Sequence, residues 1–140
     1  MPLRAQRDPF AAIHGELREC DSAIDPRRIA AAGTSFEVAL AGLLPGVSFG
    51  GGGSNPVDGT FRVALREWVS DSHAIAIQPP EGGRSEVRQR GSRNLWDELE
   101  AAFRKWVHLG EPDTDRLGLA VDTEGQHIWL DRPDNHITEV

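Results

Sequence analysis

The most regular pattern of apolar and polar positions covers residues 92–110, SRNLWDELEAAFRKWVHLG. Apolar residues recur there at the three- and four-residue spacing that forms one face of a helix. They are Leu95, Trp96, Leu99, Phe103, Trp106 and Val107. Asn94 is suited to cap the start of this helix, and Gly110 with Pro112 ends the pattern. The segment therefore predicts one long amphipathic helix packed against a face of the core.

Alternation of apolar and polar residues with a period of two, which is typical of half-buried strands, occupies four other segments. They are residues 35–40, 60–68, 73–78 and the more polar 85–91. The short run VSF at residues 47–49 is a further candidate strand. Residues 117–131, LGLAVDTEGQHIWLD, predict a hairpin with its turn at residues 122–125.

Residues 1–34 show helical signals instead. In residues 7–20 and again in residues 24–33, an Asp-Pro pair supplies a capping side chain and a first helical residue. Gly33 is suited to end the second segment. We therefore expect two short helices in residues 1–34. Residues 35–140 should form an α+β domain with a mostly antiparallel sheet.

Composition narrows the class of protein. Of the 140 residues, 39% are hydrophobic and 26% are charged, as in an ordinary soluble domain. No apolar run approaches the roughly 20 residues of a membrane span, and residues 1–16 lack the apolar middle of a secretory signal. Cys20 is the single cysteine, which excludes an intrachain disulfide and a thiol-only metal site. We therefore expect a cytoplasmic protein that does not associate with membranes.

The net charge of −7 is unevenly placed along the chain. Residues 1–94 carry 11 acidic and 11 basic residues, whereas residues 95–140 carry 11 acidic and only four basic residues. Affinity for nucleic acid comes mostly from basic residues that neutralise phosphates. The surplus of acidic residues therefore argues against a nucleic-acid partner.

Candidate catalytic, cofactor and metal motifs fail on spacing. The glycine run GGGGS, residues 50–54, is followed by Asn-Pro and a strand, so it is not a phosphate-binding loop. Such a run is typical of a flexible loop and also of an engineered linker. The predicted strands on both sides favour a natural loop. The five histidines lack metal-ligand spacing, and nothing pairs Cys20 with a base. Asp97, Glu98 and Glu100 are expected on the solvated side of the helix. We therefore expect no cofactor, no metal and no catalytic residue.

An arginine-rich segment, residues 84–93, is the main candidate for a binding surface. Arg84, Arg88, Arg90 and Arg93 are opposed there only by Glu86, and Arg88 and Arg90 point to one side of a strand. Outward arginines protect an edge strand from aggregation, which is one interpretation. The other is a peptide-docking edge, where an added strand supplies main-chain bonds and arginine selects carboxylates. Trp129, which alternates with Ile128 and Leu130, is a further candidate contact residue.

Residues 87–135 also resemble a known family. The matching motifs are Q-R-G-S-R-N-LWDELEAA at residues 89–102, W-V-H-L-G-E-P at 106–112 and RLGLAVDTEGQHIWLD at 116–131. This run is similar to the C-terminal extension of actinobacterial protein-L-isoaspartate-type O-methyltransferases. Those enzymes accompany ribosomally made, post-translationally modified peptides, namely lanthipeptides of the FxLD type and graspetides. Residues 36–52 resemble, less closely, the strand that opens the extension.

The resemblance implies a function without an active site. In those enzymes a methyltransferase domain with a glycine-rich loop for S-adenosylmethionine precedes the extension, and residues 1–34 contain no such loop. No catalytic or cofactor-binding residue is carried over. The resemblance implies a stand-alone, non-catalytic accessory module that recruits a precursor peptide or a modifying enzyme. Two alternatives stay open: a degenerate methyltransferase-related enzyme that binds S-adenosylmethionine, and a small acidic immunity-type protein.

Overall fold

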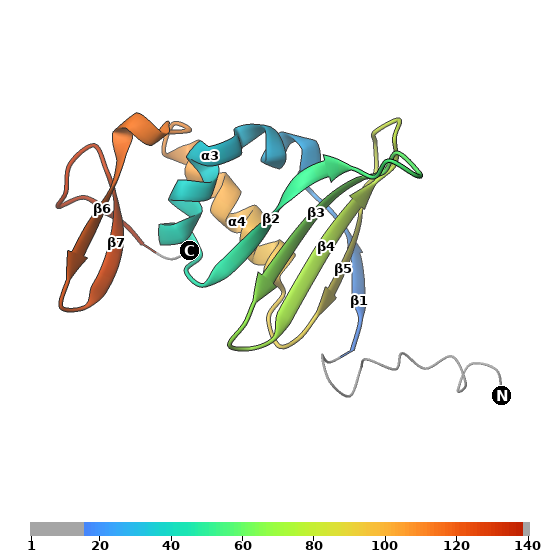
Figure 1. Cartoon of the computed structure of the whole chain (residues 1–140), viewed down its shortest axis with the longest axis horizontal. Coiled ribbons are helices and arrows are strands. Elements are labelled where there is room, and N and C mark those ends of the chain that lie inside the picture. The colour runs from blue at the N-terminus through green and yellow to red at the C-terminus, as the bar shows by residue number, and fades with distance from the viewer. Residues whose placement is uncertain (1–15, 139–140) are drawn as a thin grey trace.

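The protein, seen in a computed structural model that describes residues 16–138, contains two antiparallel sheets and two α-helices (Figure 1). The strands are β1 (Arg18–Asp21), β2 (Val47–Ser54), β3 (Phe61–Glu67), β4 (Ser72–Gln78), β5 (Glu86–Arg90), β6 (Leu117–Asp122), β7 (Gly125–Leu130) and β8 (His136–Ile137). The helices are α3 (Pro26–Leu43) and α4 (Leu95–His108), and a short 3-10 turn, η1 (Thr114–Arg116), precedes β6. The expected α+β class with a mostly antiparallel sheet is confirmed.

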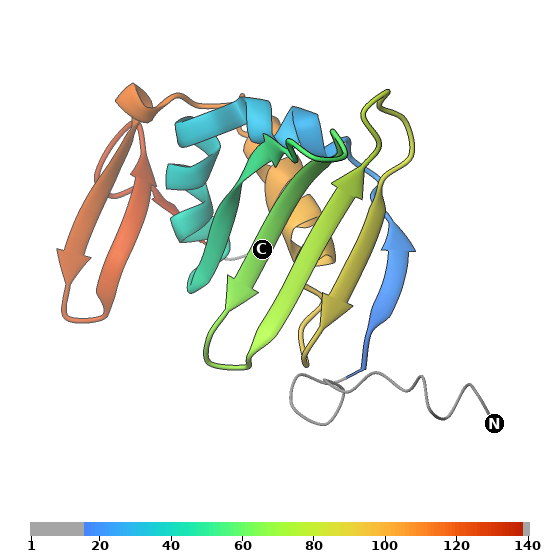
Figure 2. The ribbon, with the colours of Figure 1, turned by 45° about the vertical axis from the view of Figure 1, so that its right-hand side comes forward.

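The larger sheet has five strands in the order β1-β5-β4-β3-β2, and both helices lie on one of its faces (Figures 1 and 2). Alternate residues of β3, β4 and β5 point toward the helices and are buried: Val63, Leu65, Ala74, Ala76 and Val87. Opposite them, the ring of Phe36 lies 5.1 Å from that of Phe103 and 5.6 Å from that of Trp106, between centroids. The period-two pattern of the sequence thus becomes a sheet face that shares one core with two helices.

The smaller sheet has the order β6-β7-β8 and lies beside α3 (Figure 1). Its buried residues, Leu117, Ile128, Leu130 and Ile137, belong to the same apolar core as the larger sheet. The approach to α3 is close, because a β-carbon at Gly42 would lie 3.0 Å from Cβ of Ile128. The predicted hairpin of residues 117–131 is confirmed by the pairing of β6 with β7.

Helix α4 confirms the predicted amphipathic helix, with corrections at three positions. Val107 is 39% exposed and lies outside the apolar stripe. Asn94 precedes the helix but makes no side-chain capping bond, and its Oδ1 accepts a hydrogen bond from Nε of Arg18 instead. Glu100, expected in solvent, is only 6% exposed. Its Oε2 accepts hydrogen bonds from the backbone N–H groups of Ala23, at 2.7 Å, and Ile24, at 2.9 Å. These donors belong to the turn between β1 and α3, so the side chain points inward toward that turn.

The prediction of a strand at residues 35–40 is wrong, because α3 continues to Leu43. Gly33, with φ of 62°, interrupts the helix where the sequence ended it, and a second helical part then follows. Phe36, Leu40 and Leu43 are buried at helical spacing, and this burial against the sheet overrides their alternation. The 18 residues of α3 thus exceed the 14 of α4, and α3 crosses the expected boundary between residues 34 and 35. No described helix is long and apolar enough to cross a membrane.

The prediction of a helix at residues 7–20 is wrong for the part of this segment that the structure describes. Residues 1–15 lie outside the described residues, but residues 18–21 form β1. β1 pairs antiparallel with β5, from Arg18 opposite Gln89 to Asp21 opposite Glu86. Of the two N-terminal helices that the sequence predicts, the structure therefore contains the second, which begins at Pro26 behind the capping side chain of Asp25. The main-chain bonds of the sheet decide the conformation of residues 18–21.

The glycine run, expected as a loop, belongs to β2. Its pairing with β3 shifts register between Gly50 and Gly53, as a β-bulge does. A β-carbon at Gly52 would lie 2.6 Å from Cβ of Ala30 and from Cζ of Phe61, which is closer than real β-carbon contacts allow. Glycine is therefore required by the packing of β2 at this position, and the run is fitted to this fold.

Candidate functional site: the open face of the five-stranded sheet

No described helix covers the second face of the five-stranded sheet, which we call the open face (Figure 2). The residues that alternate with the buried ones form it: Arg62, Ala64 and Arg66 of β3, His73, Ile75 and Ile77 of β4, Glu86, Arg88 and Arg90 of β5, and Glu19 and Asp21 of β1. Strand pairing aligns them in rows, with Arg66 opposite His73 and His73 opposite Arg90. The face is therefore a mixed surface of charged side chains and small apolar ones.

One end of the open face forms a basic hollow of about 670 Å³. Its lining includes Leu17, Ala64, Arg66, Ile75, Arg88 and Arg90. Two of the apolar members, Ala64 and Ile75, are paired on β3 and β4, and the arginines come from β3 and β5 on either side of β4. The basic hollow therefore offers cationic groups at the margins of an apolar floor.

Two of these arginines are paired with carboxylates in the structure. Arg66 donates from Nη2 to Oδ1 of Asp71 at 2.9 Å, and its guanidinium lies 3.8 Å from the ring centre of Trp68. Nε of Arg66 is buried and has no hydrogen-bond partner among the described residues. Arg88 donates to both oxygens of Glu86, at 3.2 and 3.3 Å. The exposed pair of Arg88 and Glu86 is weak, so a ligand carboxylate can compete for Arg88, whereas the guanidinium of Arg66 is held by both Asp71 and Trp68.

The other end of the open face forms an acidic hollow of about 660 Å³. Its lining includes Glu19, Asp21, Ile77, Pro80, Arg84 and Glu86. Arg84 donates to Asp21 at 2.5 Å, and this hydrogen bond lowers the pKa of Asp21. The lining holds three carboxylates and one guanidinium, and one of these carboxylates, Glu86, also accepts hydrogen bonds from Arg88. Along its strands, the open face thus changes from the row of Asp21 and Glu86 to the row of Arg90, His73 and Arg66.

Arg93 acts in the scaffold. Its Nη2 donates to Oε1 of Glu98 at 2.6 Å, its Nη1 lies 3.4 Å from Oε1 of Glu67, and its backbone N–H donates to Oγ of Ser72. Hydrogen bonding to Glu98 raises the pKa of Arg93. The side chain ties the start of α4 to the turn between β3 and β4, and it does not line either hollow.

Trp129 lies in the smaller sheet, apart from the arginines. Its ring packs flat over Gly118 of β6, where a β-carbon would lie 2.0 Å from Cζ2 of Trp129. The residue is half-buried. Of the five residues that the sequence proposed as a contact surface, the structure therefore brings together only Arg88 and Arg90. Arg84 lies at the opposite end of the open face.

The prediction that residues 85–91 form an edge strand is wrong, because β5 lies between β1 and β4. Within residues 16–138 the edges of the sheet are β1 and β2. Both sides of β5 are used by neighbouring strands, so a ligand cannot add a strand to it. Arg88 and Arg90 therefore point out of a sheet face, and recognition there must use side chains.

Sequence reasoning missed Arg66, His73 and Ile75 as members of the same surface. The period of two places Arg66 on the polar side of its strand, but residues 73–78 alternate isoleucine with alanine and give no polar side for Ile75. Only the register of β3, β4 and β5 brings these residues beside Arg88 and Arg90. No protein-family model, no curated protein and no solved structure matches this chain. The argument for a function therefore depends on the chemistry of the open face.

Proposed function

We propose that this protein is a non-catalytic binding module that recruits a precursor peptide, in a peptide-modification pathway, to the open face. The observation that carries the proposal is the basic hollow, in which Arg66, Arg88 and Arg90 flank the apolar floor of Ala64 and Ile75. Guanidinium groups bind carboxylates with directional, charge-assisted hydrogen bonds. An apolar floor adds affinity for neighbouring apolar side chains.

The spacing of the arginines suits an extended peptide. Arg88 and Arg90 are two residues apart on one strand, so their Cα atoms are about 6.6 Å apart. Acidic residues at positions i and i+2 of an extended ligand have the same spacing and point to the same side. The preferred ligand is therefore an acidic-x-acidic segment with an apolar residue next to it.

The acidic hollow gives the ligand a direction. Glu19 lies opposite Arg88, whereas Asp21 and Glu86 pair at the end of the open face that is four residues along β5 from Arg90. A basic residue on the ligand is attracted to this end while its acidic residues meet the arginines. Recognition thus requires a peptide whose charges are segregated, and a peptide with the opposite charge order is disfavoured.

The resemblance of residues 87–135 to the methyltransferase extension supports the choice of a precursor peptide as ligand. β5, α4 and the β6–β7 hairpin all fall within that run, and Arg88 and Arg90 open it. The modifying enzyme is the alternative partner, and it would be recognised by the same acidic pattern on its surface.

The test is selection of peptides from a random 12-residue library displayed on phage, with the purified full chain as target. Enriched peptides are synthesised, and their affinities are measured by fluorescence anisotropy. We expect them to contain paired acidic residues at i and i+2. We also expect the double variant Arg88→Gln, Arg90→Gln to bind them more than about tenfold more weakly, since two charge-assisted contacts are lost.

The matched control is Arg104→Gln, Lys105→Gln, which removes the same charge from exposed positions of α4. It should bind the selected peptides as the unaltered chain does, and both double variants should melt near the unaltered chain. Equal weakening by the two variants would mean that net charge alone attracts the peptide. Enrichment of basic or neutral peptides would contradict the proposal. A rise in melting temperature with S-adenosylmethionine would favour the degenerate enzyme instead.

A further inference from the structure

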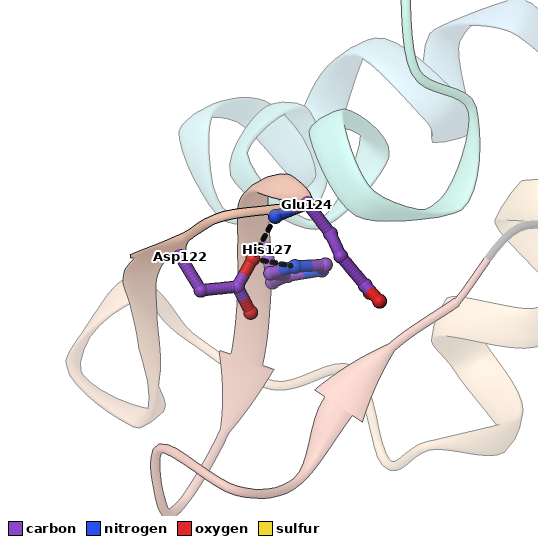
Figure 3. Close-up of side chains that lie close together, drawn as sticks. All are labelled: Asp122, Glu124 and His127. Carbon is purple, nitrogen blue, oxygen red and sulfur yellow. Dashed lines mark hydrogen bonds and ion pairs between the residues drawn. The ribbon is translucent and has the colours of Figure 1, made fainter.

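We infer that the smaller sheet carries a divalent metal site formed by Asp122, Glu124 and His127, with Zn²⁺ as the best-fitting ion. One ligand atom from each of these residues lies within 4.8 Å of the others (Figure 3). Asp122 ends β6, Glu124 lies in the turn and His127 belongs to β7, so a single hairpin brings all three together. The site is remote from the open face and independent of the peptide-binding proposal.

The hairpin turn holds the first carboxylate in place. Oδ1 of Asp122 accepts a hydrogen bond from the backbone N–H of Glu124 at 2.8 Å and lies 3.1 Å from Nε2 of His127. The dashed lines of Figure 3 mark both interactions. Asp122 and His127 are thus held in mutual contact at one point of the turn.

A second histidine fixes the ring of the first. The imidazole of His136, on β8, stacks on that of His127 with centroids 4.4 Å apart and an angle of 9° between the ring planes. His127 is the less exposed member of its pair with Asp122, at 25% of its side chain against 49%. Since a stacked ring loses less rotational freedom when it binds, His136 acts as a positioning residue for His127.

The donor set is suited to Zn²⁺. One imidazole nitrogen and two carboxylate oxygens are ligands that Zn²⁺ accepts at about 2.0–2.2 Å. The side chain of Glu124 is exposed and lies in the turn, so a rotamer change can close the remaining distance. Three protein ligands leave one position of a tetrahedral ion open, as in zinc sites that bind a small molecule.

A hollow adjoins this cluster. It measures about 600 Å³, lies between the end of α3 and the smaller sheet, and is lined by Gly42, Glu124, His127, His136 and Ile137 among others. Two of the three proposed ligands, Glu124 and His127, thus border an open hollow that is large enough for a small anion or carboxylate. The open coordination position would serve a ligand of that kind.

The test uses the untagged full chain, freed of metals with a chelator, and Zn²⁺ alone as the probe in isothermal titration calorimetry. We expect one equivalent of Zn²⁺ to bind. His127→Gln and Asp122→Asn should each weaken binding more than about tenfold, because each removes one of three ligands. His136→Phe, which keeps an aromatic ring against His127, should bind within about threefold of the unaltered chain, whereas His136→Ala should bind more weakly than His136→Phe.

The matched control is His108→Gln, which removes an exposed histidine at the end of α4 and should leave Zn²⁺ binding unchanged. Circular dichroism of each variant checks that the hairpin variants still fold. Absence of stoichiometric binding to the folded, unaltered chain would overturn the inference. So would an affinity that is the same in His127→Gln and in His108→Gln.

Discussion

The two faces of the five-stranded sheet are made from alternate residues of the same strands, yet their polar side chains differ. Those of the covered face are buried in hydrogen bonds, and those of the open face lie in exposed ion pairs. On the face that the helices cover, Oε1 of Gln89 accepts a hydrogen bond from the backbone N–H of Trp96 at 2.8 Å. Nε2 of Gln78 donates a hydrogen bond to the carbonyl of Gly83 at 2.9 Å. On the open face, Arg88 pairs with the exposed Glu86 at 3.2 Å. The covered face therefore stabilises the fold through satisfied, buried polar groups, and the open face is the one to which we propose that a peptide binds.

The largest difference between the two faces is expected when a tryptophan on each face is replaced by alanine. Trp96 is fully buried beneath the sheet, and its Nε1 donates to Oγ of Ser22 at 2.9 Å. Trp96→Ala should lower the free energy of unfolding by about 3–5 kcal/mol, through lost burial and a cavity. Trp68 is 66% exposed and contacts Arg66 at the edge of the open face. Trp68→Ala should cost less than about 1 kcal/mol.

Urea denaturation of the two variants, followed by circular dichroism, measures both values. Similar losses for Trp96→Ala and Trp68→Ala would contradict the division between a stabilising face and a binding face.

A smaller effect is expected at the buried carboxylate of α4. The carboxylate of Glu100 accepts hydrogen bonds from two backbone N–H groups of the turn between β1 and α3. Glu100→Ala should lower the free energy of unfolding by about 1–3 kcal/mol, because these donors lose their partner. The control is Glu37→Ala on the exposed side of α3, which should change stability by less than about 0.5 kcal/mol. Urea denaturation again gives the values, and an equal effect of the two variants would show that the bonds to Glu100 contribute nothing.

The pH dependence of stability gives the finest test. Glu67 lies on the covered face with a side chain that is 7% exposed, and hydrogen bonds from Ser70, Val69 and Arg93 lower its pKa from 4.5 to about 2. Because the pKa is lower in the folded state, the stabilising contribution is present above about pH 4.5 and is lost as the pH falls toward 2.

Glu67→Gln should therefore have a free energy of unfolding that changes less between pH 5 and pH 3, a range that includes the ordinary glutamate pKa of 4.5. Urea denaturation at the two pH values measures the difference. Identical pH dependence in the variant and the unaltered chain would show that Glu67 is not a source of the acid sensitivity.

The sequence predicted best where one local signal agrees with the packing. Residues 95–108 carry a continuous apolar stripe and acidic residues in the first turn, and they form α4. Residues 61–67 and 72–78 alternate cleanly, and they form β3 and β4. The turn at residues 122–125 closes the hairpin as predicted. These features depend on neighbours within a few positions, so the order of residues alone determines them.

Prediction failed where two local readings were equally good. Phe36, Val38 and Leu40 alternate as in a strand, but Phe36, Leu40 and Leu43 also share a helical face, and burial against the sheet selects the helix. A glutamate at position 100 of the helix predicts an exposed side chain, and only the hydrogen bonds from Ala23 and Ile24 hold it inside. In both cases the deciding contact comes from a residue that is distant in sequence.

The sequence by itself determined the class of fold, the amphipathic helix, the hairpin and the presence of an arginine pair on one side of a strand. The tertiary structure alone decided that β1 covers the edge of β5, and that Arg66 and Arg90 meet around one floor. It also decided that His136 stacks on His127. The physical reason is that strand register and sheet order depend on pairing between distant segments, and local periodicity carries no information about the partner.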